Sequence, residues 1–274
     1  MHRLVRPPYR DFHPRFRAAL ERLSSLPRPE HYDELAALVP RAPGVELPRF
    51  VTESREAVRR AGGYEAHVAT LRAVPTRPGH WHDFFNMCVW AHFPKLRWAL
   101  NALHVAAPGE RDPRNGRTPA QNLAATFDEA GMLVVSKSGE LLEELRDLHF
   151  KQAFWERRAE LLSSTRFWVV GHGMLESLLA PHPGLTARSL LVDWSAVEAA
   201  ESSATEPDDA LRLALDDVGA AHIESWHARR AVLDPIPVLA IPGYCENETA
   251  AFYDDRRHIP FDPCSRRHAR ALSD

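Results

Sequence analysis

Cysteine is scarce in this sequence. Its 274 residues include three cysteines, Cys88, Cys245 and Cys264, which lie far apart along the chain. An odd number of cysteines at such spacing builds neither a disulfide framework nor a paired-cysteine zinc site. Long apolar runs are also missing, which argues against a membrane-spanning helix. The N-terminus MHRLVRPPYRDF lacks the apolar segment of a secretory signal, so we expect a cytoplasmic protein.

Positive charge is not in excess. The chain has 34 Lys and Arg against 37 Asp and Glu, a formal net charge of -3. Such a balance provides no overall field to hold a phosphate backbone, so we do not expect a nucleic-acid partner. The sequence also lacks the G-x-S-x-G nucleophile elbow, the GxxxxGK[ST] phosphate loop and the G-x-G-x-x-G dinucleotide turn, which disfavours the enzyme classes that use them.

The chain has the composition of a folded protein with a substantial core, with 45% hydrophobic and 26% charged residues. Prolines are dense near the N-terminus, where two short helical segments lie between them. We predict a Pro-rich N-terminal arm with short helices over residues 1–50 and a single globular domain over residues 51–274. The expected fold class is α+β, predominantly α-helical, with a few short strands.

Helical periodicity and apolar runs predict the secondary structure of four segments between residues 132 and 241. Residues 139–164 are rich in good helix formers and give the clearest predicted helix. Residues 165–180 form a mostly apolar segment that we also predict as a helix, ended by Pro181. Residues 132–136, MLVVS, are a strand candidate, and residues 238–241, VLAI, a possible edge strand.

Four histidines lie among core residues in the stretch RPGHWHDFFNMCVWAHFPKLRWALNALH, residues 77–104. Pro94 divides this stretch into two predicted helices. We expect its aromatic and aliphatic side chains to pack in the core. His80 and His92 are expected to be surface or capping residues.

The other polar side chains of this stretch share helix faces. His82 and Asn86 are four residues apart on the first helix, and Arg97, Asn101 and His104 follow one face of the second. The two faces oppose each other if the chain bends at Pro94. Such groups either form a functional site or pair with one another inside the core, because buried polar groups must be hydrogen-bonded.

The segment GHGMLE is a second candidate. His172 and Glu176 are four residues apart, a spacing that lets both reach one metal ion or one proton-relay partner. Gly171 and Gly173 each cost a helix about 1 kcal/mol relative to Ala, so they indicate the close approach of another backbone or of a ligand. The alternative is tight helix packing around a paired His and Glu.

The segment TFDEAG contains two adjacent carboxylates, Asp128 and Glu129, beside a predicted turn at Ala130 and Gly131. In an extended segment, neighbouring side chains point to opposite faces, so we expect only one carboxylate to reach a shared site. Capping of the turn is the expected role of either residue.

Several short motifs together carry a resemblance to a known family. They are RPGHWHDFFN, FPK after Trp90, LNALH, FDEAG, GHGMLE with PGLTA, and PGYCEN with FYDD. In this order they resemble the bacterial family catalogued as domain of unknown function 3025, over about residues 74–262. The resemblance implies a single-domain protein without an assigned activity. Where the family pattern has a charged pair before FDE, this chain has Gln121 and Asn122.

Two functions are compatible with these residues. The first is an enzyme, in a metal-dependent form, acting on a small-molecule substrate with the site residues His82, Asn86, Asn101, His104, His172 and Glu176. In that form His104, His172 and Glu176 are the predicted ligands of a divalent transition metal, because imidazole and carboxylate groups suit zinc, iron or manganese. The second is a non-enzymatic binding or scaffold protein, in which the same residues form a structural buried polar network.

Overall fold

The computed structural model describes residues 6–106, 111, 116–201, 207–227 and 231–261. Helices outnumber strands in the described residues, which confirms the predicted α+β, predominantly α-helical class. The buried hydrophobic side chains form a cluster that extends from Tyr9 to Ile259. None of the described helices is long and apolar enough to cross a membrane.

A four-stranded sheet lies at the centre, in the order β4-β3-β5-β6. Its strands are β3 (Gly131–Ser136), β4 (Thr165–Val169), β5 (Thr186–Asp193) and β6 (Asp234–Pro237). Strand β3 is antiparallel to β4 and parallel to β5, and β5 is antiparallel to β6. Every residue of β3 is buried, as expected for a strand covered on both faces, and this confirms the strand predicted at residues 132–136.

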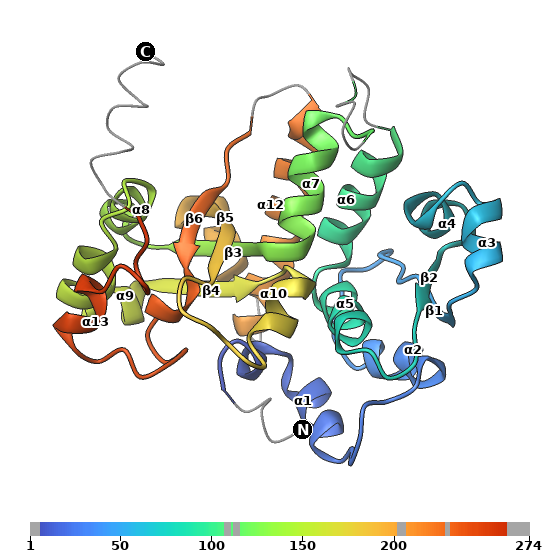
Figure 1. The fold of residues 1–274 in the computed structure, drawn as a ribbon, viewed down its shortest axis with the longest axis horizontal. Helices are drawn as coiled ribbons and strands as arrows, with labels where there is room; N and C mark the ends of the chain where they lie inside the picture. The colour runs from blue at the N-terminus through green and yellow to red at the C-terminus, as the bar shows by residue number, and fades with distance from the viewer. Residues whose placement is uncertain (1–5, 107–110, 112–115, 202–206, 228–230, 262–274) are drawn as a thin grey trace.

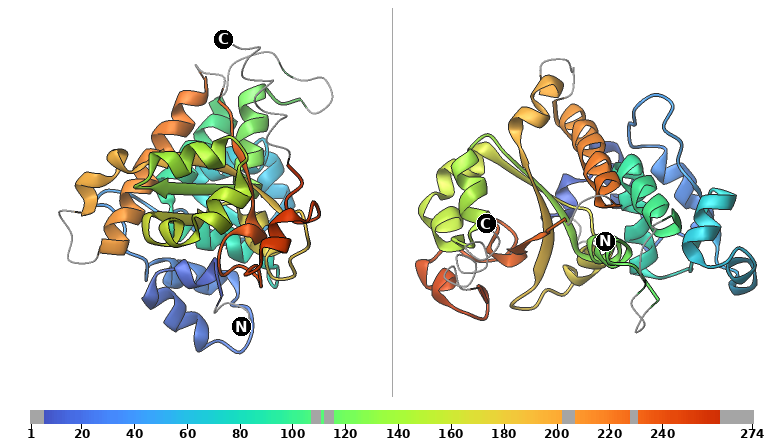
Figure 2. Two further views of the ribbon diagram at one scale, coloured as in Figure 1. Left: turned by 90° about the vertical axis from the view of Figure 1, so that its left-hand side faces the viewer. Right: turned by 90° about the horizontal axis from the view of Figure 1, so that it is seen from above.

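Helices cover both faces of this sheet (Figure 2). On one side lie α8 (Gly139–Arg146) and α9 (Arg158–Ser164), and on the other α7 (Pro119–Ala130) and α12 (Pro207–Glu224). Helix α6 (Pro94–Ala106) packs along α12. The remaining helices are α1 (Pro14–Glu21), α2 (Tyr32–Ala36), α3 (Arg55–Arg60), α4 (Tyr64–Leu71), α5 (Trp81–His92), α10 (His172–Ser177), α11 (Glu198–Glu201) and α13 (Ala250–Asp254).

A smaller, two-stranded parallel sheet lies beside the helices, opposite α8 and α9 (Figure 1). It pairs β1 (Arg49–Thr52) with β2 (Ala73–Thr76), and α3 and α4 connect the two strands. The N-terminal segment before β1 contains the short helices α1 and α2 and packs on the body of the protein. Its Tyr9 hydroxyl donates a hydrogen bond to the carbonyl of Leu175 at 2.7 Å.

Two predicted helices differ from the structure. The segment 139–164 is broken by Leu148, whose φ of 65° is left-handed, and by a π-helical turn over Gln152–Glu156. Residues 165–180 are not one helix, because the first five form β4 and the helix begins only at His172. The segment RFWVV is short, aromatic and β-branched, so its apolar pattern fits strand and helix alike, and pairing with β3 decides its state.

The predicted edge strand at residues 238–241 is also wrong. A 3-10 turn covers Val238–Ala240, and the edge strand is β6, which immediately precedes it. Pro235 and Pro237 lie in β6, where an edge position tolerates their missing N–H groups. By contrast, the division of residues 77–104 is confirmed, since α5 ends at His92 and α6 begins at Pro94.

Candidate metal centre

Three helices meet at one end of the central sheet, and the antiparallel pairing of β3 with β4 brings two of them together. Helix α7 leads directly into β3, and β4 leads to α10. Because Met132 pairs with Val169 across the antiparallel strands, the end of α7 lies beside the start of α10. The carbonyl of Gly131 accepts hydrogen bonds from the N–H groups of Val170 and Gly171, both at 2.9 Å. Helix α5 packs against α10 and supplies the third side.

Glycines 171 and 173 make this approach possible. A Cβ atom at Gly171 would overlap with the backbone of Ala130 and Gly131, and one at Gly173 would overlap with the side-chain carboxylate of Glu129. Of the two approaches predicted from these glycines, that of another backbone or of a ligand, the backbone approach is confirmed at Gly171. A side chain at position 171 would separate α10 from the end of α7, whereas one at position 173 would first displace the carboxylate of Glu129.

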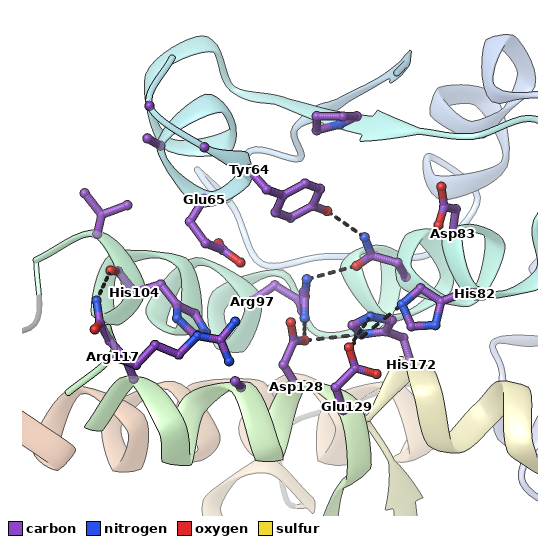
Figure 3. A pocket seen from close by; sticks show the side chains of 18 of the residues that line it. Tyr64, Glu65, His82, Asp83, Arg97, His104, Arg117, Asp128, Glu129 and His172 are labelled. Atoms are coloured by element: carbon purple, nitrogen blue, oxygen red, sulfur yellow. Dashed lines mark hydrogen bonds and ion pairs between the residues drawn. The ribbon is translucent and has the colours of Figure 1, made fainter. Parts of the chain in front are cut away.

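One residue from each helix contributes to a compact group of His82, Glu129 and His172 (Figure 3). Nε2 of His172 lies 3.6 Å from Oε1 of Glu129, and Nε2 of His82 lies 3.9 Å from the same oxygen. The two imidazole rings are 4.3 Å apart between centroids. One ligand atom from each residue lies within 4.8 Å of the other two, so the group could hold a metal ion.

Each histidine of the group has a second carboxylate on its other ring nitrogen. Nδ1 of His82 lies 3.1 Å from Oε2 of Glu176, and Nδ1 of His172 lies 3.4 Å from Oδ1 of Asp128. At His82 the hydrogen bond to Glu176 favours the tautomer protonated at Nδ1, which leaves the lone pair of Nε2 directed toward Glu129. At His172 the carboxylate of Asp128 lies beside Nδ1 at ion-pair distance without a hydrogen bond. This arrangement, with a carboxylate behind each imidazole, is typical of histidines that bind metal ions.

A buried ion pair with Arg97 holds Asp128 in place, and hydrogen bonds from Arg97 continue through Asn86 to Tyr64. Oδ1 of Asp128 contacts the guanidinium of Arg97, whose Nη2 donates to Oδ1 of Asn86 at 2.9 Å. Asn86 in turn donates to the hydroxyl of Tyr64 at 2.9 Å. The contact between Asn86 and Arg97 confirms that the polar faces of α5 and α6 oppose each other across the bend. Burial of the guanidinium lowers the pKa of Arg97.

Burial also determines the charge of the histidines on this side of the protein. It lowers the pKa of His172 to about 4, with a smaller contribution from the charge of Arg97. The pKa of His104 is likewise lowered to about 4 by burial, aided by the charges of Arg117 and Arg97. His172 is therefore neutral near pH 7, which is the form of imidazole that binds a metal ion.

The predicted site residues fall into two sets, one at the group of His82, Glu129 and His172 and one further along α6. His82 and His172 belong to the group of three. Glu176 contacts Nδ1 of His82, and Asn86 accepts a hydrogen bond from Arg97. His104 and Asn101 lie further along α6, outside the group. The predicted ligand set of His104, His172 and Glu176 is thus not the set that the structure brings together, because Glu176 contacts Nδ1 of His82 and His104 lies two helical turns beyond Arg97.

The expectation for Asp128 and Glu129 is wrong. These carboxylates do not lie in an extended segment or a turn, because α7 continues to Ala130 and both of them contact His172. The sequence contains the signal for this helix. Thr118 and Gln121 form a capping box with Pro119 at the first helical position, and no helix breaker follows before Gly131.

The group of three lines a cavity of about 710 Å³. The cavity extends between α4, α6 and α7, with His82, Glu129 and His172 at one end and His104 and Arg117 toward the other (Figure 3). Most of its described lining side chains are polar or charged, and Tyr64 is the one aromatic residue among them. The walls therefore offer hydrogen bonds and charges rather than an apolar surface.

Comparison with known families places this chain. A family described as "Protein of unknown function (DUF3025)" matches residues 48–262. The chain belongs to this family. The DUF3025 match contains all three residues of the group and begins immediately before β1. No curated protein and no solved structure matches the chain.

Proposed function

We propose that this DUF3025 protein is a metal-dependent enzyme that acts on a small polar molecule. His82, His172 and Glu129 are the proposed ligands of a divalent transition metal. The observation that carries the proposal is that both histidines have a carboxylate near each of their two ring nitrogens. Each has Nε2 within 4 Å of Glu129 Oε1 and Nδ1 beside a carboxylate of its own.

The chemistry of the ligand set favours zinc, iron or manganese. Two imidazoles and one carboxylate are the ligands of catalytic zinc sites and of non-haem iron sites, both of which keep an open position for water or substrate. A metal ion bound there would act as a Lewis acid and lower the pKa of a bound water. A structural zinc site, by contrast, is usually closed by a fourth protein ligand.

The cavity supports a small, hydrophilic substrate. Its volume of about 710 Å³ is within the usual range for small-molecule sites, and its charged lining would leave the polar groups unpaired against an apolar ligand. The proposed ligands differ in their exposure to solvent, since His172 is buried and Glu129 is exposed. A substrate in the cavity would therefore reach the metal from the side of Glu129.

Elemental analysis of the purified protein, followed by metal titration of stripped protein, tests the proposal. We expect about one equivalent of zinc, iron or manganese in the wild type, none in His172→Ala, and retention in His104→Ala, which lies outside the ligand group. Metal-loaded protein should turn over at least one member of a panel of small phosphate esters, amides and hydroxy acids, and stripped protein should not. Wild-type protein that binds none of the three metals would contradict the proposal and favour the binding or scaffold role.

A further inference from the structure

The carboxylates that line the cavity are not equivalent. Asp83 accepts three hydrogen bonds from Arg77, at 2.6, 3.0 and 2.6 Å. Asp128 contacts Arg97 and His172, and Glu129 contacts the two histidines of the group. Each of these three carboxylates is already paired with a cation or an imidazole, so none of them is free to exchange a proton with a bound molecule.

Glu65 is different, because its side chain is held by a neutral amide. Oε2 of Glu65 accepts a hydrogen bond from Nδ2 of Asn101 at 2.6 Å. The same amide nitrogen also donates to the backbone carbonyl of Glu65 at 2.9 Å. The two bonds fix the direction of the carboxyl group without neutralising its charge.

The carboxyl group of Glu65 points from α4 into the cavity, toward the wall that carries Arg97 and Asp128 (Figure 3). Burial raises its pKa, against the opposing effects of the Asn101 hydrogen bond and of the charges of Arg97 and His172. A carboxylate with a raised pKa is a stronger base than one in water, and proton-transfer groups work best when their pKa lies near the working pH.

We propose that Glu65 is the proton-accepting catalytic residue of this site, and that Asn101 is its positioning residue. Glu65 takes a proton from a water or hydroxyl group held between it and the group of His82, Glu129 and His172. The O–H bond breaks, its electron pair stays on the oxygen, and the proton passes to the carboxylate. This role rests on the proposed function, since a metal ion held by His82, Glu129 and His172 would bind the oxygen that loses the proton.

Cobalt(II)-loaded protein tests this role without a known substrate. The visible spectrum of cobalt(II) changes when a water at the ion loses a proton, so its pH midpoint reports the groups that face that water. Glu65→Gln keeps the shape of the side chain and removes the negative charge that opposes the ionisation. We expect its midpoint to fall by about one pH unit, and Asn101→Ala to shift the midpoint in the same direction by less. Glu53→Gln, at an exposed carboxylate on the cavity rim, is the matched control and should leave it unchanged.

Two failures are distinguishable. If cobalt(II) binds the wild type and the midpoint is the same in wild type and Glu65→Gln, Glu65 does not face the reacting oxygen and this inference is overturned. If cobalt(II) does not bind the wild type at this group, the proposed metal-dependent function itself is overturned. Thermal unfolding of each variant verifies that the comparison is made between folded proteins.

Discussion

Glu129 fits beside His172 because residue 173 is glycine. Oε1 of Glu129 lies 3.6 Å from Nε2 of His172, and a Cβ atom at Gly173 would occupy the space of the other carboxylate oxygen. The site therefore depends on a missing side chain as much as on the residues present. This relationship, together with the carboxylates behind the histidines, leads to the following predictions.

Gly173→Ala should weaken metal binding more than it weakens folding. The added methyl group overlaps most with the flexible carboxylate of Glu129 and meets the Glu129 backbone carbonyl only at 3.1 Å, so the fold can adapt but the ligand moves. We expect at least a tenfold rise in the zinc dissociation constant, measured by titration of stripped protein. Gly139→Ala is the matched control, because a Cβ atom there meets nothing within 4 Å. Equal zinc affinity in both variants would exclude Glu129 as a ligand.

Gly171→Ala should destabilise the fold itself. Its methyl group meets the backbone of Ala130 and Gly131, which cannot move without disturbing the pairing of β3 with β4. Overpacking of this kind costs about 3 kcal/mol, which urea denaturation measures directly. An unfolding free energy within error of that of Gly139→Ala would show that α10 shifts away at little cost.

Glu176→Ala should lower metal affinity although Glu176 is not a proposed ligand. Its carboxylate lies 3.1 Å from Nδ1 of His82 and stabilises the ring in the metal-binding tautomer. Removal of such an outer carboxylate typically costs roughly 10- to 100-fold in affinity. Glu176→Gln keeps an acceptor for Nδ1 and should lose less. If both variants bind zinc as tightly as the wild type, Glu176 has no part in the site.

His92, a buried histidine away from the site, predicts that the stability of the fold decreases in acid. His92 is 2% exposed, so the expectation of a surface position is wrong. Nε2 of His92 accepts the backbone N–H of His13 at 2.9 Å, and Nδ1 lies 2.7 Å from the carbonyl of Cys88, so the ring is neutral. Burial, together with the charge of Arg212, lowers its pKa to about 3.

The sign of the effect follows from the unfolded pKa of 6.5. Below that value the unfolded chain takes up a proton at His92 and the folded protein does not, so the contribution of His92 to stability is lost as the pH falls from 6.5 toward 3. The wild type should lose up to about 1.4 kcal/mol per pH unit relative to His92→Gln, which cannot titrate. Urea unfolding of both proteins between pH 7 and 4 measures this difference. A difference that stays constant with pH would contradict the assignment of a neutral ring.

Local signals were sufficient for part of this fold. The helix break at Pro94, the strand MLVVS and the glycines of GHG each follow from backbone chemistry that acts within a few residues, and the structure has all three features. The prediction of a helix over RFWVV is wrong, because its short apolar run fits a strand as well as a helix. Its pairing with β3 is a contact between segments about 30 residues apart, which periodicity does not report.

The candidate site could also be predicted only in part, because local signals indicate single residues but not which distant segments meet. His82 and His172 are visible as histidines among apolar residues, and Asn86 as their neighbour on a helix face. Glu129 is not among the predicted ligands because the composition of FDEAG suggests a turn, although the capping box at Thr118 indicates a helix that ends beside Gly131. The antiparallel pairing of β3 with β4 then decides that Glu129, and not Glu176, shares one oxygen with both histidines.

The central claim is that His82, Glu129 and His172 bind one metal ion. Anomalous diffraction at the zinc edge, from crystals of stripped protein soaked in zinc, tests it most directly. We predict an anomalous peak about 2.0–2.2 Å from Nε2 of both histidines and from a carboxylate oxygen of Glu129, and no such peak in crystals of His172→Ala. A well-ordered wild-type site without a peak, or a peak held by other residues, would contradict the claim.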